Sequence, residues 1–184
     1  IGQGCDLVTT REPGGTRIGE EIRALLHDPE YTEMAAHTEI LLYSASRAQL
    51  VTQVICPALD EGAIVLCDRY FDSTYAYQGY GRGLQMEDLR SITAFATQAL
   101  MPDLTLYLDV PAEVGLRRRT QNGEEFNRLD REALDFHRRV REGYLTLARA
   151  EPSRWRVLDA TGIIDEVQAE VQAAILSFLS DFKL

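Results

Sequence analysis

The sequence has 184 residues and a formal net charge of −10; 45% of the residues are hydrophobic and 26% are charged. This length and composition suit one ordinary globular domain, so we expect a single domain over residues 1–184. The acidic balance argues against a binder of nucleic-acid polymers, and no apolar run reaches the roughly 20 residues of a membrane helix, so we expect a cytoplasmic protein.

Short apolar runs alternate with longer stretches of helical periodicity along the chain. The runs predict strands at residues 6–10, 63–67, 104–108 and 155–158. Helices are predicted around residues 18–26, 37–59 (with a kink or stop at Pro57) and 86–100, from Pro111 onward, and over 130–150 and 164–182. Strands that alternate with helices predict a doubly wound α/β fold with a parallel sheet, whose ligands bind at the carboxyl ends of the strands.

Residues 10–16, which read TREPGGT, directly follow the first expected strand. Two glycines and a proline favour a tight turn whose backbone can approach a ligand closely, at the edge where such a sheet binds its ligands. An ordinary strand-to-helix turn explains the same residues equally well.

Tyr43 and Arg47 are four residues apart on one predicted helix, so their side chains share a face. An aromatic ring beside a guanidinium suits a planar ligand. From these two residues alone, a partly buried tyrosine next to a surface arginine is the more ordinary interpretation.

The apolar strand at residues 63–67 leads directly into Asp68, Arg69 and Tyr70. A carboxylate at a strand tip is where a phosphotransferase holds magnesium or its water shell, and an arginine binds phosphate through charge-assisted hydrogen bonds. A salt bridge at the strand end explains this short segment equally well.

Residues 72–83, which read DSTYAYQGYGRG, give the strongest indication of a site. Gln78 can present a donor and an acceptor together, which is the pair needed to read a pyrimidine edge, and hydroxyl and aromatic side chains surround it. We interpret this stretch as a ligand-contacting loop rather than a structural one.

Residues 117–130 place Arg117, Arg118, Arg119 and Arg128 around a polar stretch centred on Gly123. Such a segment between helices can act as a mobile lid that brings positive charge to a transferring phosphoryl group. A solvated, charged helix face is the simpler interpretation of the arginines alone.

Taken in this order, the segments resemble the bacterial type of the thymidylate kinase family. The resemblance rests on TREPGGT, on Asp-Arg-Tyr at a strand end and on STYAYQG, and it is supported by YSASRAQ at 43–49, PDLTLYLDV at 102–110 and DAT at 159–161. It covers essentially the whole chain. It implies a P-loop nucleoside monophosphate kinase fold and a homodimer that uses ATP and Mg²⁺ to phosphorylate dTMP to dTDP.

The resemblance also implies roles for individual residues. The dTMP phosphate is expected at Arg69, Arg23 and the turn at Glu12 and Pro13; Tyr43 should stack on thymine, Arg47, Thr74 and Gln78 should contact the base edge, Tyr77 should pack under the deoxyribose, and Ser73 is a further dTMP contact. Asp68 should support magnesium, the turn of Asp159, Ala160 and Thr161 should border adenine, and Arg118 and Arg128 are the favoured catalytic arginines of the lid. The lid departs from the family pattern at Thr120 and Asn122.

The phosphate-binding loop of the family, G-x-x-x-x-G-K-[ST], has no match in these 184 residues, whose single lysine is Lys183. In the family this loop follows a mid-sheet first strand and leads into the first helix. We therefore expect a fold that lacks the first strand, P-loop and first helix, and a 184-residue polypeptide without dTMP kinase activity. The rival hypotheses are another nucleoside monophosphate kinase and a catalytically dead nucleotide-binding relative.

Overall fold

The structure is a computed structural model that describes residues 6–121 and 127–181; Gly123 and Lys183 lie outside these ranges. Its strands are β1 (Leu7–Arg11), β2 (Ile64–Asp68), β3 (Thr105–Asp109) and β4 (Trp155–Asp159). All four strand predictions are confirmed, and each strand extends one residue further toward its carboxyl end than the apolar run does. The extra residue is charged in every case and lies at the carboxyl edge of the strand pair.

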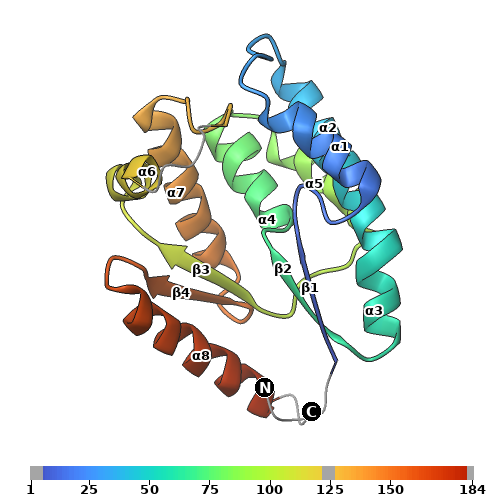
Figure 1. The fold of residues 1–184 in the computed structure, drawn as a ribbon, viewed down its shortest axis with the longest axis vertical. Helices are drawn as coiled ribbons and strands as arrows, with labels where there is room; N and C mark the ends of the chain where they lie inside the picture. The colour runs from blue at the N-terminus through green and yellow to red at the C-terminus, as the bar shows by residue number, and fades with distance from the viewer. Residues whose placement is uncertain (1–5, 122–126, 182–184) are drawn as a thin grey trace.

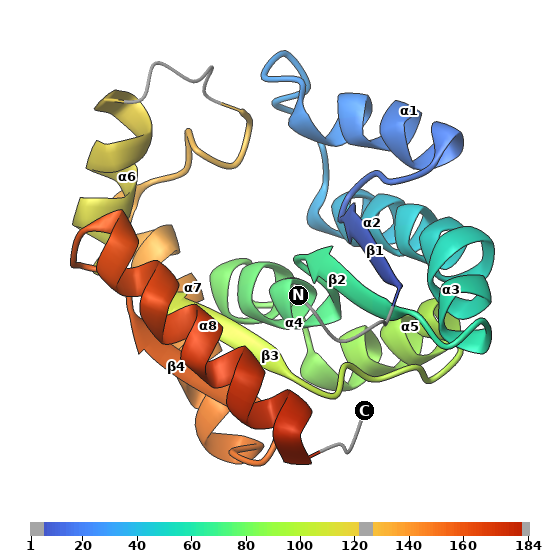
Figure 2. The same cartoon turned by 60° about the horizontal axis from the view of Figure 1, so that its bottom comes forward.

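The strands form two parallel pairs, β1 with β2 and β3 with β4. Figures 1 and 2 show the two pairs as separate units, and β2 and β3 are not hydrogen-bonded to each other in the described part of the chain. The prediction of an α/β fold with parallel strands is confirmed, whereas the described residues do not form one continuous sheet.

The first helical region contains α1 (Arg17–His27), α2 (Ala36–Leu50), the π-helical segment η1 (Val51–Ile55) and α3 (Cys56–Asp60). From α2 to α3 the helical backbone is continuous and ends at Asp60, so the predicted stop at Pro57 is wrong, while the predicted kink stays a prediction. Pro57 lies in the first turn of α3, and the wider π-helical turn immediately before it accommodates a residue without an N–H group.

Residues 72–83, interpreted from the sequence as a loop, are mostly helical, and this is a correction. They fall in α4 (Phe71–Thr74) and the π-helical segment η2 (Tyr75–Gly81), followed by α5 (Met86–Thr97). A Cβ atom on Gly81 would lie 2.7 Å from Phe136 Cε2, so glycine here lets η2 approach its neighbouring helix closely. Glycine-rich composition therefore marked close helix packing rather than a loop.

The carboxyl-terminal half adds α6 (Ala112–Gln121), α7 (Leu134–Ala150) and α8 (Ile164–Asp181). Helix α6 begins directly after Pro111, as predicted. Helix α7 begins four residues later than predicted because Asn127 Oδ1 accepts hydrogen bonds from the backbone N–H groups of Leu129 and Asp130, which stabilises a turn there. Figure 1 shows α7 and α8 on opposite sides of the β3–β4 pair.

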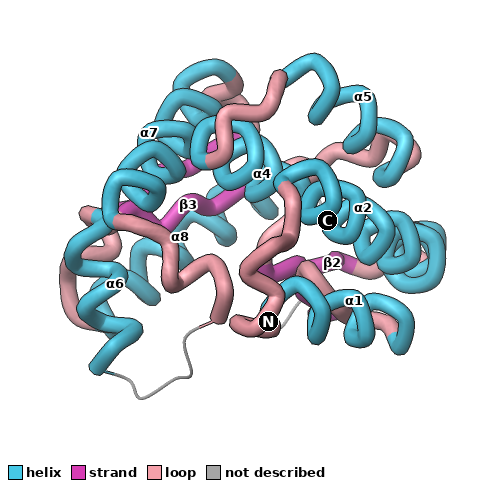
Figure 3. The backbone as a smooth tube through the Cα atoms, turned by 90° about the horizontal axis from the view of Figure 1, so that it is seen from above, coloured by secondary structure: helices cyan, strands magenta, loops and turns pink. Residues whose placement is uncertain are grey.

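Helix α7 packs against η2, and this contact builds the core nearest to the functional residues. The cluster contains Ala76, Leu129, Phe136 and Val140, and the half-buried rings of Tyr43, Tyr77 and Tyr144 pack against it. Helix α2 also packs on α1 and α5 (Figure 3). The helices that surround η2 therefore hold its side chains in fixed positions.

Large apolar side chains are exposed on β2 and β3, one strand from each of the two pairs. Leu66 of β2 is 53% exposed and Leu108 of β3 is 47% exposed. Parallel strands are ordinarily buried on both faces, so these exposed fractions mark an uncovered surface of the sheet. No helix in the described ranges is both long enough and apolar enough to cross a membrane.

Candidate active site

Each strand ends in a charged residue at its carboxyl end. Arg11 of β1 stands beside Asp68 of β2, and Asp109 of β3 stands beside Asp159 of β4. This is the edge at which open α/β sheets bind ligands, and the segments at residues 10–16 and 68–70 begin at it.

The turn after β1 is attached to α2 by a buried ion pair. Glu12 accepts hydrogen bonds from Arg47 Nε at 2.8 Å and from Arg47 Nη2 at 2.6 Å, and both side chains are almost fully buried. Gly15 has a φ of 76°, and a Cβ there would lie 2.4 Å from Thr10 Oγ1, so only glycine fits this position. The turn is therefore held in place by α2 through a two-point contact.

Arg47 keeps one donor unused. Its Nη1 atom is buried and has no hydrogen-bond partner in the described part of the chain. A buried guanidinium N–H without an acceptor is costly, so this position favours an incoming acceptor atom. Arg47, which the sequence assigns to the base edge, thus supports the turn with one side of its guanidinium and leaves the other side available.

Arg69 is placed by an unusual backbone conformation at the end of β2. Its φ is 68°, in the left-handed region that non-glycine residues rarely adopt. The guanidinium carbon lies 5.2 Å from the centre of the Tyr77 ring, and Nη2 lies 3.4 Å from the Tyr77 hydroxyl. Arg23 reaches the same region from α1, where its Nη1 donates to the carbonyl oxygen of Pro13 at 2.9 Å.

Aromatic rings form the wall beside Arg69. Tyr43 and Tyr77 pack on the same core cluster, and burial raises the pKa of Tyr43 above its ordinary value. Tyr144 of α7 meets the Tyr77 ring edge-on with centroids 6.3 Å apart, and its hydroxyl donates to Ser73 Oγ at 2.7 Å. Sequence analysis missed Tyr144, because nothing in the α7 pattern distinguishes it from an ordinary core tyrosine.

Thr74 and Gln78 lie on the buried side of α4 and η2. Gln78 Nε2 donates to Glu39 Oε1 at 2.8 Å, and Glu39 is itself fully buried on α2. Sequence analysis also missed Glu39, although Glu39, Tyr43 and Arg47 are spaced i, i+4 and i+8 on one helix face. That spacing is the signal that could have identified it.

Asp68 is exposed, and its carboxylate has no hydrogen bond or ion pair in the described ranges. No group of three or more His, Cys, Asp or Glu side chains gathers as a metal site in the part of the chain that the structure describes. Magnesium usually keeps several waters and takes one or two carboxylates together with substrate phosphates, so a single free carboxylate at a strand end fits it.

The β3–β4 side carries the turn of Asp159, Ala160 and Thr161. Asp159 Oδ1 accepts from the Thr161 N–H at 2.8 Å, and hydrogen bonds from Thr161 lower the pKa of Asp159 below its ordinary value. Arg118 of α6 donates to the carbonyl oxygens of Ala160 at 2.6 Å and Thr161 at 2.8 Å. The structure thus brings Arg118 together with the turn that the sequence assigns to adenine.

Arg128 lies elsewhere. It is 8% exposed, its Nη2 donates to the Glu39 carboxylate, and its Nε donates to the carbonyl oxygen of Leu26. The two arginines assigned to the lid are therefore in different environments. Arg118 contacts the Asp159–Ala160–Thr161 turn, whereas Arg128 contacts Glu39. Residues 122–126 of the expected lid at 117–130 lie outside the described residues.

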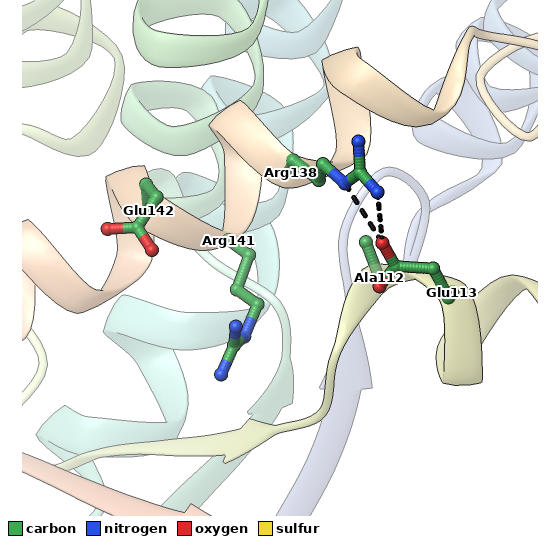
Figure 4. A pocket seen from close by; sticks show the side chains of 5 residues that line it. All are labelled: Ala112, Glu113, Arg138, Arg141 and Glu142. Atoms are coloured by element: carbon green, nitrogen blue, oxygen red, sulfur yellow. Dashed lines mark hydrogen bonds and ion pairs between the residues drawn. The ribbon is translucent and has the colours of Figure 1, made fainter.

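A cavity of about 350 Å³ lies between α6 and α7 (Figure 4). It is lined by Ala112, Glu113, Arg138, Arg141 and Glu142. Arg138 Nη2 donates to Glu113 at 2.6 Å, and Arg141 forms a two-point ion pair with Asp109 at 2.7 Å. Its arginines already have carboxylate partners and no residue predicted from the sequence lines it, so this cavity is not the candidate site.

Comparisons with known proteins identify the same family as the motifs. Residues 1–171 match the family model described as thymidylate kinase. The chain is 51% identical to a thymidylate kinase of Roseiflexus castenholzii, over 95% of this chain and 81% of that protein. It is also 50% identical to a thymidylate kinase of Geobacillus thermodenitrificans, over 98% of this chain and 81% of that protein.

Proposed function

This chain belongs to the thymidylate kinase family of phosphotransferases, and on that premise we propose that it transfers the γ-phosphoryl group of ATP to dTMP, giving dTDP. One observation carries the proposal. Arg69 lies against the Tyr77 ring, and Tyr43 packs on the same cluster as Tyr77. Gln78, the residue after Tyr77, is tied through Glu39 to the helix that carries Tyr43. A ring, a phosphate-binding cation and an amide in one place suit a pyrimidine mononucleotide.

We assign the acceptor nucleotide to this wall. Tyr43 stacks on the thymine ring, and the unused Nη1 of Arg47 together with Thr74 and Gln78 contacts the base edge. The half-buried ring of Tyr77 packs under the deoxyribose, with Ser73 beside it.

The phosphate of dTMP belongs with Arg69 and Arg23, next to the turn at Glu12 and Pro13. The hydrogen bond from Arg23 to Pro13 supports this assignment because it brings a second guanidinium to the turn that faces the end of β2. Two arginines offset the charge of a phosphomonoester through charge-assisted hydrogen bonds.

We assign ATP to the β3–β4 side, with adenine bordered by Asp159, Ala160 and Thr161. Arg118 is favoured over Arg128 as the lid arginine, because Arg118 already contacts this turn and Arg128 is buried in a separate ion-pair cluster. Asp68 is the residue that would hold Mg²⁺, which neutralises phosphate charge when it is bound.

Catalysis on this arrangement needs no covalent intermediate. The two strand-end sites hold the nucleotides facing each other, and the transfer is in-line between them. Arg69 fixes the attacking phosphate oxygen, while Arg118 offsets negative charge that develops on the transferred group.

We further propose that one more strand lies between β2 and β3 in the complete fold of the family. The free edges of these two strands and the exposed side chains of Leu66 and Leu108 support this proposal, because an apolar strand and its following helix would pair the edges and cover the side chains. The turn after such a strand is where a phosphate-binding loop belongs. A single domain over residues 1–184 with a lid near 117–130, located in the cytoplasm, completes the proposal.

Binding of mononucleotides tests the acceptor assignment directly. We expect isothermal titration calorimetry to give the tightest binding for dTMP, weaker binding for dUMP, and at least about tenfold weaker binding for dCMP and GMP, because a mismatched hydrogen-bonding edge leaves buried groups unpaired. Comparable or tighter binding of GMP would instead favour another nucleoside monophosphate kinase, and binding of none would reject the site.

We also propose that two copies associate through the packed helices α2 and α5. Leu41 of α2 is exposed, and Phe95 of α5 is 88% exposed, which is unusual for so large an apolar side chain. Both helices lie on one side of the molecule in Figure 3. A second copy of the same face would remove these side chains from water.

Phe95→Glu should convert a dimer into a monomer, because a charge replaces an apolar anchor of the interface. Sedimentation velocity at micromolar concentration should show the dimer dissociation constant rising about 100-fold. Ile164→Glu, on the exposed side of α8, is the matched control and should leave the dimer intact. An unchanged sedimentation coefficient for Phe95→Glu would remove α5 from the interface.

A further inference from the structure

Glu39 is the centre of a buried ion-pair cluster that reaches the base-contacting residues. The residue is 0% exposed on α2, and its carboxylate accepts from Gln78 Nε2 at 2.8 Å. Arg82 donates to the same carboxylate through Nε at 3.3 Å and Nη2 at 3.1 Å, and Arg128 donates through Nη2. Three side chains from two segments, η2 with its C-cap and the turn at Arg128, thus share one buried anion.

The cluster keeps Glu39 ionised. Burial raises the pKa of the Glu39 carboxyl, but hydrogen bonds from Arg82, Gln78 and Arg128 lower it more, so the pKa lies below its ordinary value. An ionised carboxylate has no proton to donate and acts only as an acceptor. Each group that faces Glu39 must therefore present a donor.

This requirement fixes the direction of the Gln78 side-chain amide. The NH₂ end must point to Glu39, because turning the amide around would place the Gln78 carbonyl oxygen against the carboxylate. Gln78 Oε1 has no hydrogen-bond partner in the described ranges. The oxygen and the second N–H of Gln78 are thus left for a ligand, in an order that Glu39 determines.

The order of donor and acceptor is what separates thymine from cytosine. Thymine presents an N3–H donor beside a carbonyl acceptor, so it matches an amide that offers its oxygen to N3 and its N–H to the carbonyl. Cytosine presents N3 as an acceptor beside an amino donor, so it matches the same amide only after the amide is turned around.

We propose that Glu39 is a positioning residue that selects thymine over cytosine by locking the orientation of the Gln78 amide. The inference rests on the proposed function, since it needs the pyrimidine of dTMP to lie at Gln78. Glu39 touches no substrate itself. Its effect is carried by one hydrogen bond to the residue that reads the base.

Glu39→Gln tests the proposal because the new side chain has nearly the same shape but can donate as well as accept. The Gln78 amide is then free to turn around. Titration calorimetry with dTMP, dUMP and dCMP should show the preference for dTMP over dCMP falling about tenfold or more. The affinity for dUMP should fall in parallel with that for dTMP, because uracil has the same hydrogen-bonding edge as thymine.

Glu132→Gln is the matched control. Glu132 also pairs with Arg82, at 2.5 Å, but in the described part of the chain it forms no hydrogen bond with Gln78, so this variant disturbs the cluster without freeing the amide. It should keep the wild-type preference for dTMP over dCMP. A purely structural role for the cluster would give similar losses for all three nucleotides in Glu39→Gln.

Folding is checked separately by far-ultraviolet circular dichroism. If Glu39→Gln does not fold, Glu39→Asp serves instead, because it keeps the charge for the two arginines and withdraws the acceptor from Gln78 by one methylene. The same fall in preference is expected. An unchanged dTMP-to-dCMP ratio in a folded variant overturns the role of Glu39, whereas unsubstituted protein that binds neither nucleotide overturns the proposed function.

Discussion

A polypeptide of these 184 residues should show no measurable ATP-dependent phosphorylation of dTMP, and joining a strand, a G-x-x-x-x-G-K-[ST] loop and a helix to its amino end should raise the rate at least about 1,000-fold. The reason is that backbone N–H groups and a lysine must bind the phosphates of ATP. The sequence contains no such loop, and Asp68 is the only strand-end carboxylate assigned to the phosphate region. Formation of dTDP, followed by chromatography, measures the effect.

The same addition has a structural consequence that can be measured independently. A strand between β2 and β3 would pair two free edges and cover Leu66 and Leu108, so the midpoint of thermal unfolding should rise. The control is the same addition with the loop lysine replaced by alanine, which should restore stability but not activity. Robust turnover by the 184-residue polypeptide itself would contradict this prediction.

Arg69→Ala in the active, extended protein should lower kcat/KM for dTMP by about 1,000-fold. Two charge-assisted hydrogen bonds from a guanidinium to phosphate are each worth about 1.5–3 kcal/mol, and both are lost. The unusual φ of 68° at this position supports a functional role, because the fold tolerates strain in order to hold the side chain beside Tyr77. Steady-state kinetics with varied dTMP measures the loss.

Two further variants show what the Arg69 result means. Arg69→Lys keeps the charge but not the two-point geometry, so its kcat/KM should fall between those of the unsubstituted protein and Arg69→Ala. Arg90→Ala removes an exposed arginine of α5 and should leave kcat/KM unchanged. If Arg69→Ala behaves like Arg90→Ala, the phosphate of dTMP does not bind at the end of β2.

The strands were predictable because each is a short run rich in apolar and β-branched residues with charged or turn-forming residues around it, and that local signal suffices for a parallel strand. Residues 72–83 were not predictable as helix. Gly79 and Gly81 lower helix propensity, and only packing against Met86 and Phe136 explains why glycine is needed there. Tertiary contacts, which a local pattern does not contain, decided this segment.

In the candidate site, likewise, some features were predictable from the sequence and others depend on tertiary contacts. Arg69 and Gln78 stood out because their residue types and their neighbours are unusual for a structural segment. The contacts that hold the site together were not predictable, since Glu12 and Arg47 are 35 residues apart and Gln78 and Glu39 are 39 residues apart. A hydrogen bond or ion pair across such a separation gives no periodic signal in a single sequence.

For the lid role proposed for Arg118, its contacts with the Asp159–Ala160–Thr161 turn describe the state of this side chain before a nucleotide binds. A guanidinium that donates hydrogen bonds to two main-chain carbonyl oxygens must break them before the same N–H groups can bind a nucleotide phosphate. Exchanging neutral oxygens for anionic ones is favourable once a triphosphate arrives, since the new bonds are charge-assisted. Under the proposed function, Arg118 would therefore leave the carbonyl oxygens of Ala160 and Thr161 only when a triphosphate binds beside them.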